Sequence, residues 1–268
     1  MSLIKAFCIA FSTYSKIPMP QFEWKEKDMR YHLIFFPLIG AVIGAGLYGW
    51  GILCRWLELP EFAFTLVAAV IPIFVTGGFH VDGFMDTMDA WKSYKSKEEK
   101  LKIMKDPHIG AFSVIMLALY GMVYLASVSL LNRDGYLLFA VSFAVARILS
   151  ALTVMTFPHA KEEGMLYTMS GKMNVYPSSS HEESKTSGRR LVIVVLILEL
   201  MVCAGWMIWK NAILGVEMLL ADALLVLYYD LRTRKELGGI TGDTAGYFVV
   251  CSEVLAGVVA AVHSNISG

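Results

Sequence analysis

The feature that most constrains this chain is a series of apolar runs, each long enough to cross a lipid bilayer. A membrane-spanning helix needs about 20 mostly apolar residues. Seven such runs cover approximately residues 31–53, 62–81, 111–131, 136–157, 191–209, 212–229 and 245–264. Apolar residues make up 56% of the chain, which is more than an ordinary soluble domain contains. The sequence therefore predicts an all-α fold, a polytopic membrane helix bundle of about seven spans that forms a single domain over residues 1–268 and contacts the lipid bilayer.

The distribution of lysine and arginine predicts how this bundle is oriented. Before, between and after the seven spans, the segments carry in order five, one, six, one, five, one, three and no basic residues. Segments on the cytoplasmic side are the richer ones in membrane proteins. The alternation predicts a cytoplasmic N-terminus and places residues 82–110, 158–190 and 230–244 on the cytoplasmic side. Overall, 23 basic and 23 acidic residues cancel, so the composition gives no basis for binding nucleic acid.

The stretch "GGFHVDGFMDTMDAW", residues 77–91, places three acids beside a membrane-length run. If a helix resumes after the two glycines, Asp82, Asp86 and Asp89 stand at i, i+4 and i+7 and share one face. Like charges at this spacing repel, and acids within an apolar frame usually face a polar cavity. We therefore expect these carboxylates to bind a hard divalent cation such as Mg²⁺. The alternative is a solvated charged face balanced by the lysines that follow.

Two further ionisable residues leave alternatives open. His80 precedes the acids and is either a hydrogen-bonded structural residue or a catalytic base. Arg147 stands near the middle of an apolar span, where an arginine is costly unless it faces a partner. That partner is either an anionic substrate or an acidic side chain.

A second polar cluster, "LGGITGDTAGY", precedes the seventh span. Gly239 and Gly242 allow the backbone to approach a ligand closely, and Thr241, Asp243 or Thr244 is suited to cap the following helix. The free N–H groups of a helix start favour phosphate. The alternative is a flexible turn followed by an ordinary cap, and Asp243 is also suited to join the metal cluster.

Taken together, "GGFHVDGFMDTMDAW", "KIMKDPHIGAFSVI" and "LGGITGDTAGY" resemble, in this order and spacing, the cobalamin synthase family, the adenosylcobinamide-GDP ribazoletransferases. The resemblance extends over most of the chain and includes the N-terminal "FSTYSKIPMP". The acid block is its most specific part, since it matches the family's His-x-Asp-Gly-x-x-Asp-Thr-x-Asp pattern. Two departures are Ala90, where glycine is usual, and Pro107–His108, which replaces a pair that often ends in arginine.

The resemblance implies a multi-pass enzyme of the cytoplasmic (inner) membrane with its active site facing the cytoplasm. Such an enzyme joins adenosylcobinamide-GDP to α-ribazole or α-ribazole 5′-phosphate, releases GMP and uses Mg²⁺. Asp82, Asp86 and Asp89 would hold the metal, and Asp89 or His80 would accept the ribazole proton. Lys105, Asp106 and residues 238–243 would hold phosphate or guanine. A homo-oligomer or an association with other corrinoid-pathway enzymes is also expected.

Two other functions compete with this interpretation. A CDP-alcohol phosphotransferase-like enzyme also uses spaced aspartates beside membrane helices, but the Gly-x-x-x-Asp-x-x-x-Asp ending of that signature is not matched here. An ion-coupled transporter would use the intramembrane acids and Arg147 as a relay. Transporters often contain repeated halves, and the acid block has no second copy in this sequence.

Overall fold

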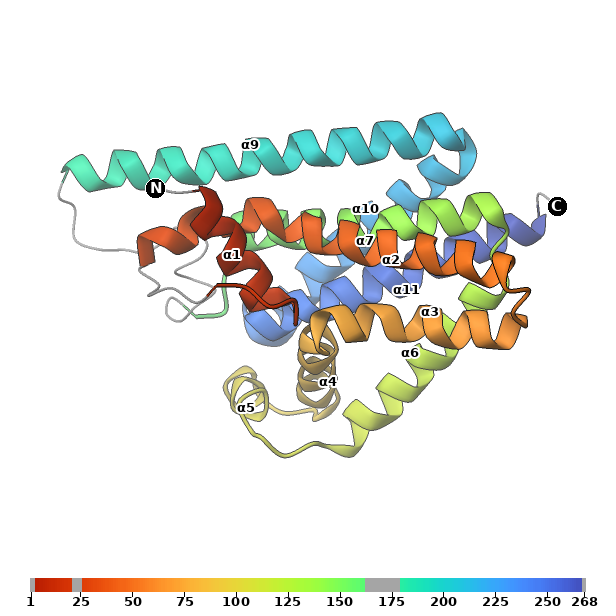
Figure 1. Ribbon diagram of the computed structural model, residues 1–268. Helices are drawn as coiled ribbons and strands as arrows, with labels where there is room; N and C mark the ends of the chain where they lie inside the picture. Colours follow the sequence, from red (N-terminus) through yellow and green to blue (C-terminus); the bar gives the residue numbers. More distant parts are fainter. Residues whose placement is uncertain (1–2, 21–25, 162–178, 267–268) are drawn as a thin grey trace.

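The computed structural model describes residues 3–20, 26–161 and 179–266. Its elements are α1 (Leu3–Tyr14), the 3₁₀ helix η1 (Glu26–Phe35), α2 (Phe36–Trp56), α3 (Glu61–Thr76), α4 (Phe79–Lys92), α5 (Lys97–Ile103), α6 (Ala111–Ser129), α7 (Arg133–Thr156), α9 (Ser179–Lys210), α10 (Ala212–Leu237) and α11 (Gly242–Ile266). Among the described residues, six segments are long and apolar enough to cross a membrane, and a seventh is added if α3 and α4 count as one bent span. The predicted all-α membrane bundle is therefore confirmed (Figure 1).

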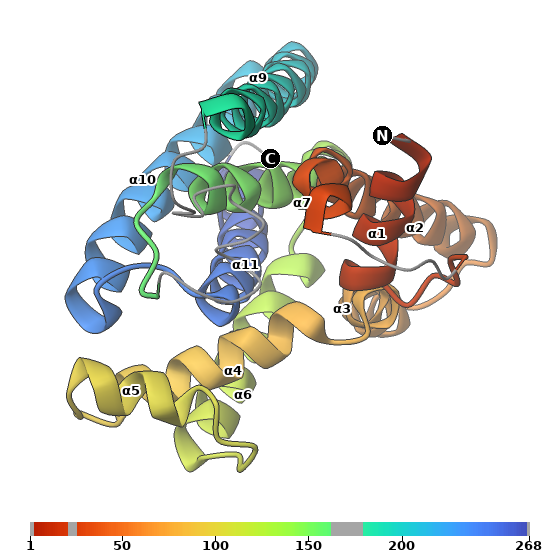
Figure 2. The ribbon, with the colours of Figure 1, turned by 90° about the vertical axis from the view of Figure 1, so that its left-hand side faces the viewer.

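Two of the predicted spans end at a different place in the structure. The run predicted over residues 62–81 breaks after Thr76, because Gly77 and Gly78 take φ values of 65° and 82° that end the helix. The next helix, α4, starts at an angle of 93° to α3 and lies across the end of the bundle (Figure 2). The run predicted to end at residue 229 continues as helix to Leu237. By length and hydropathy the spans are α2, α6, α7, α9, α10 and α11. Helix α3 passes only together with α4, which turns away across the end of the bundle.

The extension of α10 has a structural role outside the apolar part of the bundle. Glu236 near its end pairs with Lys100 of α5, and the Lys97 ammonium donates a hydrogen bond to the Arg234 carbonyl at 3.2 Å. The Arg232 guanidinium lies 5.3 Å from the centre of the Trp91 ring of α4. These contacts hold α4 and α5 against the end of α10.

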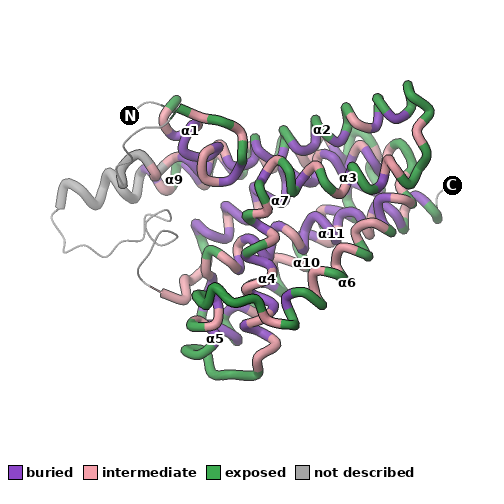
Figure 3. The backbone as a smooth tube through the Cα atoms, turned by 60° about the horizontal axis from the view of Figure 1, so that its bottom comes forward, coloured by how far each residue is buried: buried purple, intermediate pink, exposed green. Residues whose placement is uncertain are grey.

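The centre of the bundle consists of α7 and α11. In the most apolar stretches of α7 and α11, 78% and 67% of the residues are buried, against 17% in those of α6 and α9. Helix α6 lies at the periphery in Figure 3, and α9 runs along the edge of the bundle in Figure 1. Helix α2 packs closely on α7 because a Cβ atom at Gly40 or Gly44 would overlap the α7 backbone at Phe143 or Ala140. Small residues that let two helix backbones approach are a common means of association within a membrane.

The polar segments gather at one end of the bundle. Helices α1, α4 and α5, the start of α9 and the junction of α10 with α11 lie at this end, and the C-terminus lies at the other (Figure 1). Residues 82–110, 230–244 and the described parts of 158–190 are therefore on the same side, as the distribution of basic residues predicts. Helix α9 already begins at Ser179, so the predicted loop over 158–190 is shorter than expected.

Candidate active site

The site is built on a close crossing of α4 and α11. A Cβ atom added to Gly83 of α4 would lie 2.7 Å from the Asp243 carbonyl oxygen, and one added to Gly246 of α11 would lie 3.1 Å from the His80 carbonyl oxygen. Glycine at these two positions lets the helices meet backbone to backbone. The crossing brings the start of the acid block next to the first turn of α11.

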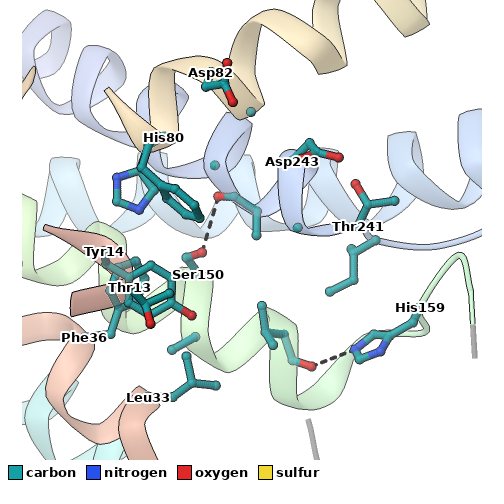
Figure 4. Close-up of a pocket in the computed structure, with 18 of the residues that line it drawn as sticks. Thr13, Tyr14, Leu33, Phe36, His80, Asp82, Ser150, His159, Thr241 and Asp243 are labelled. Atoms are coloured by element: carbon teal, nitrogen blue, oxygen red, sulfur yellow. Dashed lines mark hydrogen bonds between the residues drawn. The ribbon is translucent and has the colours of Figure 1, made fainter. Parts of the chain in front are cut away.

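A cavity of about 390 Å³ opens beside this crossing (Figure 4). Helices α1, α2, α4, α7 and α11 all contribute to its wall, together with η1 and the segment after α7. The predicted site residues that line it are His80, Asp82, Thr241, Gly242 and Asp243. The structure thus brings the two polar clusters of the sequence into one site.

The three aspartates of α4 share one helix but have different surroundings. Asp82 is exposed and lines the cavity, and Asp86 is half-buried. The Asp89 carboxylate accepts hydrogen bonds from the Gly110 N–H at 2.7 Å and the Ser113 N–H at 2.9 Å. Asp89 therefore fastens the start of α6 to α4, and its role as a metal ligand stays a prediction.

The carboxylates at this end of the bundle are close enough to influence one another. Burial, together with the negative charges of Asp82, Asp243 and Asp89, raises the pKa of Asp86 to about 6. Such an accumulation of hard oxygen donors fits the chemistry of Mg²⁺. Within the described ranges, no three His, Cys, Asp or Glu side chains converge on one point as they stand. An ion would therefore bind only if the carboxylates turn toward it.

His80 lies between the acids and the membrane interior. Its side chain is buried, and its Nε2 atom has no hydrogen-bond partner among the described residues. Burial, and to a lesser extent the charge of Arg147, lowers the pKa of His80 well below its ordinary value. His80 therefore presents a neutral imidazole at the edge of the cavity rather than a charged one.

Thr241 caps α11 and is one of the three cap residues that the sequence allows. Its hydroxyl accepts the Thr244 N–H at 3.2 Å, and the Thr244 hydroxyl accepts the Thr241 N–H at 2.8 Å. This exchange leaves Asp243 to line the cavity. A Cβ atom at Gly242 would meet nothing within 4 Å, so the backbone is open there.

The other glycine identified in the sequence, Gly239, packs against the backbone of the segment after α7 rather than facing the cavity. A Cβ atom at Gly239 would lie 2.6 Å from the Pro158 carbonyl oxygen. The adjacent Ile240 donates its N–H to that oxygen at 2.9 Å and accepts the Ala160 N–H at 2.9 Å. These bonds hold the segment after α7 at the cavity, where it contributes His159 and Lys161 to the wall.

Three predicted substrate-binding residues lie elsewhere. Lys105 and Asp106 are exposed between α5 and α6, where the Asp106 carboxylate accepts the His108 N–H at 3.0 Å. Arg147 is buried and pairs with Glu253 at 2.8 Å, beside a second cavity of about 170 Å³. The structure thus agrees with the alternative in which Arg147 has an acidic partner. A direct role in substrate binding stays a prediction for all three.

Several residues of the cavity wall were not identified as site residues from the sequence. Tyr14, Phe36 and Ser150 line the cavity. In a chain this apolar, such residues on helices cannot be distinguished by sequence from ordinary packing residues. His159 and Lys161 follow the fourth apolar run directly, and this position on the basic side of the membrane is the one signal that pointed to them.

Comparison with known proteins gives a consistent family. The model of the cobalamin-5-phosphate synthase family matches residues 6–261. An adenosylcobinamide-GDP ribazoletransferase of Lachnoclostridium phytofermentans is 37% identical over 266 residues, which cover 99% of this chain and 97% of the relative. Proteins of the same name from Clostridium perfringens and Clostridium botulinum are 30% and 31% identical, over 93% and 95% of this chain and 94% and 96% of theirs. No solved structure matches the chain significantly.

Proposed function

The chain belongs to the cobalamin-5-phosphate synthase family, and on this premise we propose that it is an adenosylcobinamide-GDP ribazoletransferase that works with Mg²⁺. The reaction joins the adenosylcobinamide phosphate group to α-ribazole or α-ribazole 5′-phosphate and releases GMP. One observation carries the proposal for the site. Asp82 of α4 and Asp243 of α11 line the same cavity, with Asp86 close enough to Asp82 and Asp243 for their charges to raise its pKa.

The carboxylates alone would repel the pyrophosphate of the substrate, so the proposal requires a cation. Asp82, Asp86 and Asp243 are the residues that would hold it, and they supply only oxygen donors. A bound Mg²⁺ would neutralise the charge that develops on the departing phosphate. Asp89 is a less suitable ligand, because both its oxygens already accept backbone N–H groups.

The remaining groups of the cavity orient the substrates. The open backbone at Gly242, in the first turn of α11, is suited to receive a phosphate oxygen. The ribazole hydroxyl forms the new bond to phosphorus while the bond from phosphorus to GMP breaks. We assign the hydroxyl proton to His80, since its ring lines the cavity and its Nε2 atom has no hydrogen-bond partner among the described residues. The other expected base, Asp89, is directed toward α6.

We further infer the place of the enzyme in the cell. The apolar helices make it a multi-pass membrane protein. The basic segments lie at the same end of the bundle as the cavity, which supports a location in the cytoplasmic (inner) membrane with the active site facing the cytoplasm. Charged nucleotides would reach the cavity from that side. Association with a second copy or with other corrinoid-pathway enzymes stays a prediction.

A product assay tests this function. Purified protein in detergent is given Mg²⁺, adenosylcobinamide-GDP and α-ribazole, and both GMP and the completed corrinoid are measured. We expect the two products in equal amounts, and no product when EDTA removes the metal. Release of CMP from a CDP-activated alcohol would indicate a CDP-alcohol phosphotransferase instead. Ion flux in vesicles without any product would indicate a transporter.

A further inference from the structure

The cavity has two ends of different chemistry. Asp82, Thr241 and Asp243 lie at one end, and Tyr14, Leu33 and Phe36 lie at the other (Figure 4). Leu33 and Phe36 make the second end apolar, and Ala151 and Val154 of α7 add further apolar side chains to the cavity wall. A volume of about 390 Å³ is near the lower limit of the roughly 300–1,000 Å³ typical of small-ligand pockets. It suits a nucleoside and is too small to enclose a corrinoid.

Four rings form the wall of the apolar end, which we call the aromatic end. Tyr14 of α1 lies 4.5 Å from Phe36 of α2 and 5.6 Å from Phe79 of α4, measured between ring centres. His80 lies 5.5 Å from Phe36 and 5.5 Å from Phe79. Its ring is parallel to that of Tyr14 within 12°. Three separate elements thus gather aromatic rings at this end of the cavity, and such rings favour a flat aromatic ligand.

The polar atoms at this end restrict which flat ligand fits. The Tyr14 hydroxyl is already hydrogen-bonded to the His32 Nε2 atom at 3.1 Å. The Thr13 hydroxyl and the His80 Nε2 atom are both buried and have no hydrogen-bond partner in the part of the chain that the structure describes. Thr13 lines the cavity, so rotation of its side chain would bring the hydroxyl to a ligand with one hydrogen-bond acceptor. Such a bond would be favourable, because each unpaired polar group that is buried costs free energy.

The proposed reaction brings three planar bases to the enzyme: the guanine of the GDP group, the adenine of the adenosyl group and the benzimidazole of ribazole. Guanine and adenine carry several donors and acceptors at their edges, which the apolar side chains of Leu33 and Phe36 would leave unpaired. A ribose-linked benzimidazole has a single free ring nitrogen, which is an acceptor. Its chemistry therefore matches both the aromatic faces and the Thr13 hydroxyl.

We propose that the aromatic end of the cavity binds the benzimidazole base of ribazole, with the Thr13 hydroxyl donating a hydrogen bond to the free ring nitrogen. This assignment rests on the proposed function. It directs the ribose of the bound nucleoside toward Asp82, where the hydroxyl reacts. The residues of the aromatic end therefore determine which base the enzyme attaches.

Phe79 offers the safest test, because its ring lines the cavity and is 47% exposed. In Phe79→Ala, we expect the KM for α-ribazole and its dissociation constant to rise about 10-fold. The KM for adenosylcobinamide-GDP should not change, and Phe79→Tyr should restore ribazole binding. Phe74→Ala is the matched control, since that ring on α3 is 79% exposed and lies outside the cavity wall. A rise in the KM for adenosylcobinamide-GDP alone would overturn the proposal, as would unchanged constants for both substrates.

A substitution of Thr13 tests the proposed hydrogen bond between its hydroxyl and the free ring nitrogen of ribazole. Thr13→Val removes the hydroxyl at almost constant shape, and we expect about 5-fold to 10-fold weaker binding of α-ribazole. For the indole riboside, in which carbon replaces the free nitrogen, wild type and Thr13→Val should bind equally. An equal loss for both ligands would contradict the hydrogen bond. Binding is measured without the corrinoid substrate, so its outcome does not depend on the product assay. If wild type bound ribazole but released no GMP, the proposed function would be refuted while the assignment of the aromatic end would stand.

Discussion

The molecule contains two charged regions on either side of His80, and they are built in opposite ways. Toward the membrane interior, the Arg147 guanidinium pairs with the Glu253 carboxylate at 2.8 Å, and Arg147 is 1% exposed. At the end of the bundle, Asp82 and Asp243 line the cavity, and Asp86 lies close enough for their negative charges to act on it. One region balances its charge within the protein, and the other accumulates negative charge.

This difference separates a structural role from a chemical one. Burying a pair of opposite charges carries a desolvation penalty that their attraction offsets, and the loss of either partner leaves an uncompensated charge. A cluster of carboxylates gains nothing for the fold and is useful only with a cation from solution. Substitutions in the paired region should therefore act mainly on stability, and those in the acidic region mainly on catalysis.

The largest effect is expected in the acidic region. Asp82→Asn and Asp243→Asn should each lower kcat for GMP release by about 10²–10³-fold, because each removes a charge that holds the cation. The unfolding temperature in detergent should stay equal to that of wild type or rise, since like-charge repulsion is relieved. Wild-type turnover in both variants would refute the role of the cluster.

The paired region should respond in the opposite manner. Arg147→Met should lower the free energy of unfolding by about 3 kcal/mol, because it leaves Glu253 buried without a partner. The double variant Arg147→Met with Glu253→Gln should recover most of this loss, as equilibrium unfolding in detergent would measure. If Arg147→Met remained stable but raised the KM for adenosylcobinamide-GDP, the arginine would bind substrate, and the contrast between the two regions would fail.

The crossing of α4 and α11 holds the acidic region together. Gly83→Ala would force its Cβ to within 2.7 Å of the Asp243 carbonyl oxygen and move the two helices apart. We expect about a 10-fold loss of kcat, since a small misplacement of catalytic groups is costly. Gly205→Ala in α9 is the control, because its Cβ would meet nothing within 4 Å. Equal activity of the two variants would show that the close crossing is not needed.

Asp89 belongs to the acid block of α4 but has a structural role like that of the paired region. As a carboxylate that accepts two N–H groups at the start of α6, it should contribute stability, and Asp89→Asn should cost about 1 kcal/mol of unfolding free energy. The loss of kcat should then be far smaller than in Asp82→Asn. A loss of the same size in both variants would instead identify Asp89 as a metal ligand.

The sequence predicted what depends on local pattern. Hydropathy located the spans, and the spacing of Asp82 and Asp86 correctly indicated a shared helix. The predictions were less complete where a residue's partner lies far along the chain. Arg147 meets Glu253 on another helix, and Asp89 meets the start of α6.

The aromatic end of the cavity was also beyond sequence reasoning. Tyr14 and Phe36 come from different helices, and each resembles an ordinary packing residue in an apolar chain. The sharp bend after Thr76 had a local signal in Gly77 and Gly78, but the angle of 93° depends on how α4 packs on α11. Contacts between elements, rather than the elements themselves, are what the sequence left undetermined.

Binding of Mn²⁺ measures the central claim most directly. Electron paramagnetic resonance of purified protein should show saturable Mn²⁺ binding that Mg²⁺ displaces, and the double variant Asp82→Asn with Asp243→Asn should lose it. Glu217→Gln is the control, because that carboxylate pairs with His263 near the other end of α11 and should leave binding unchanged. Equal Mn²⁺ binding by wild type and the double variant would contradict the account.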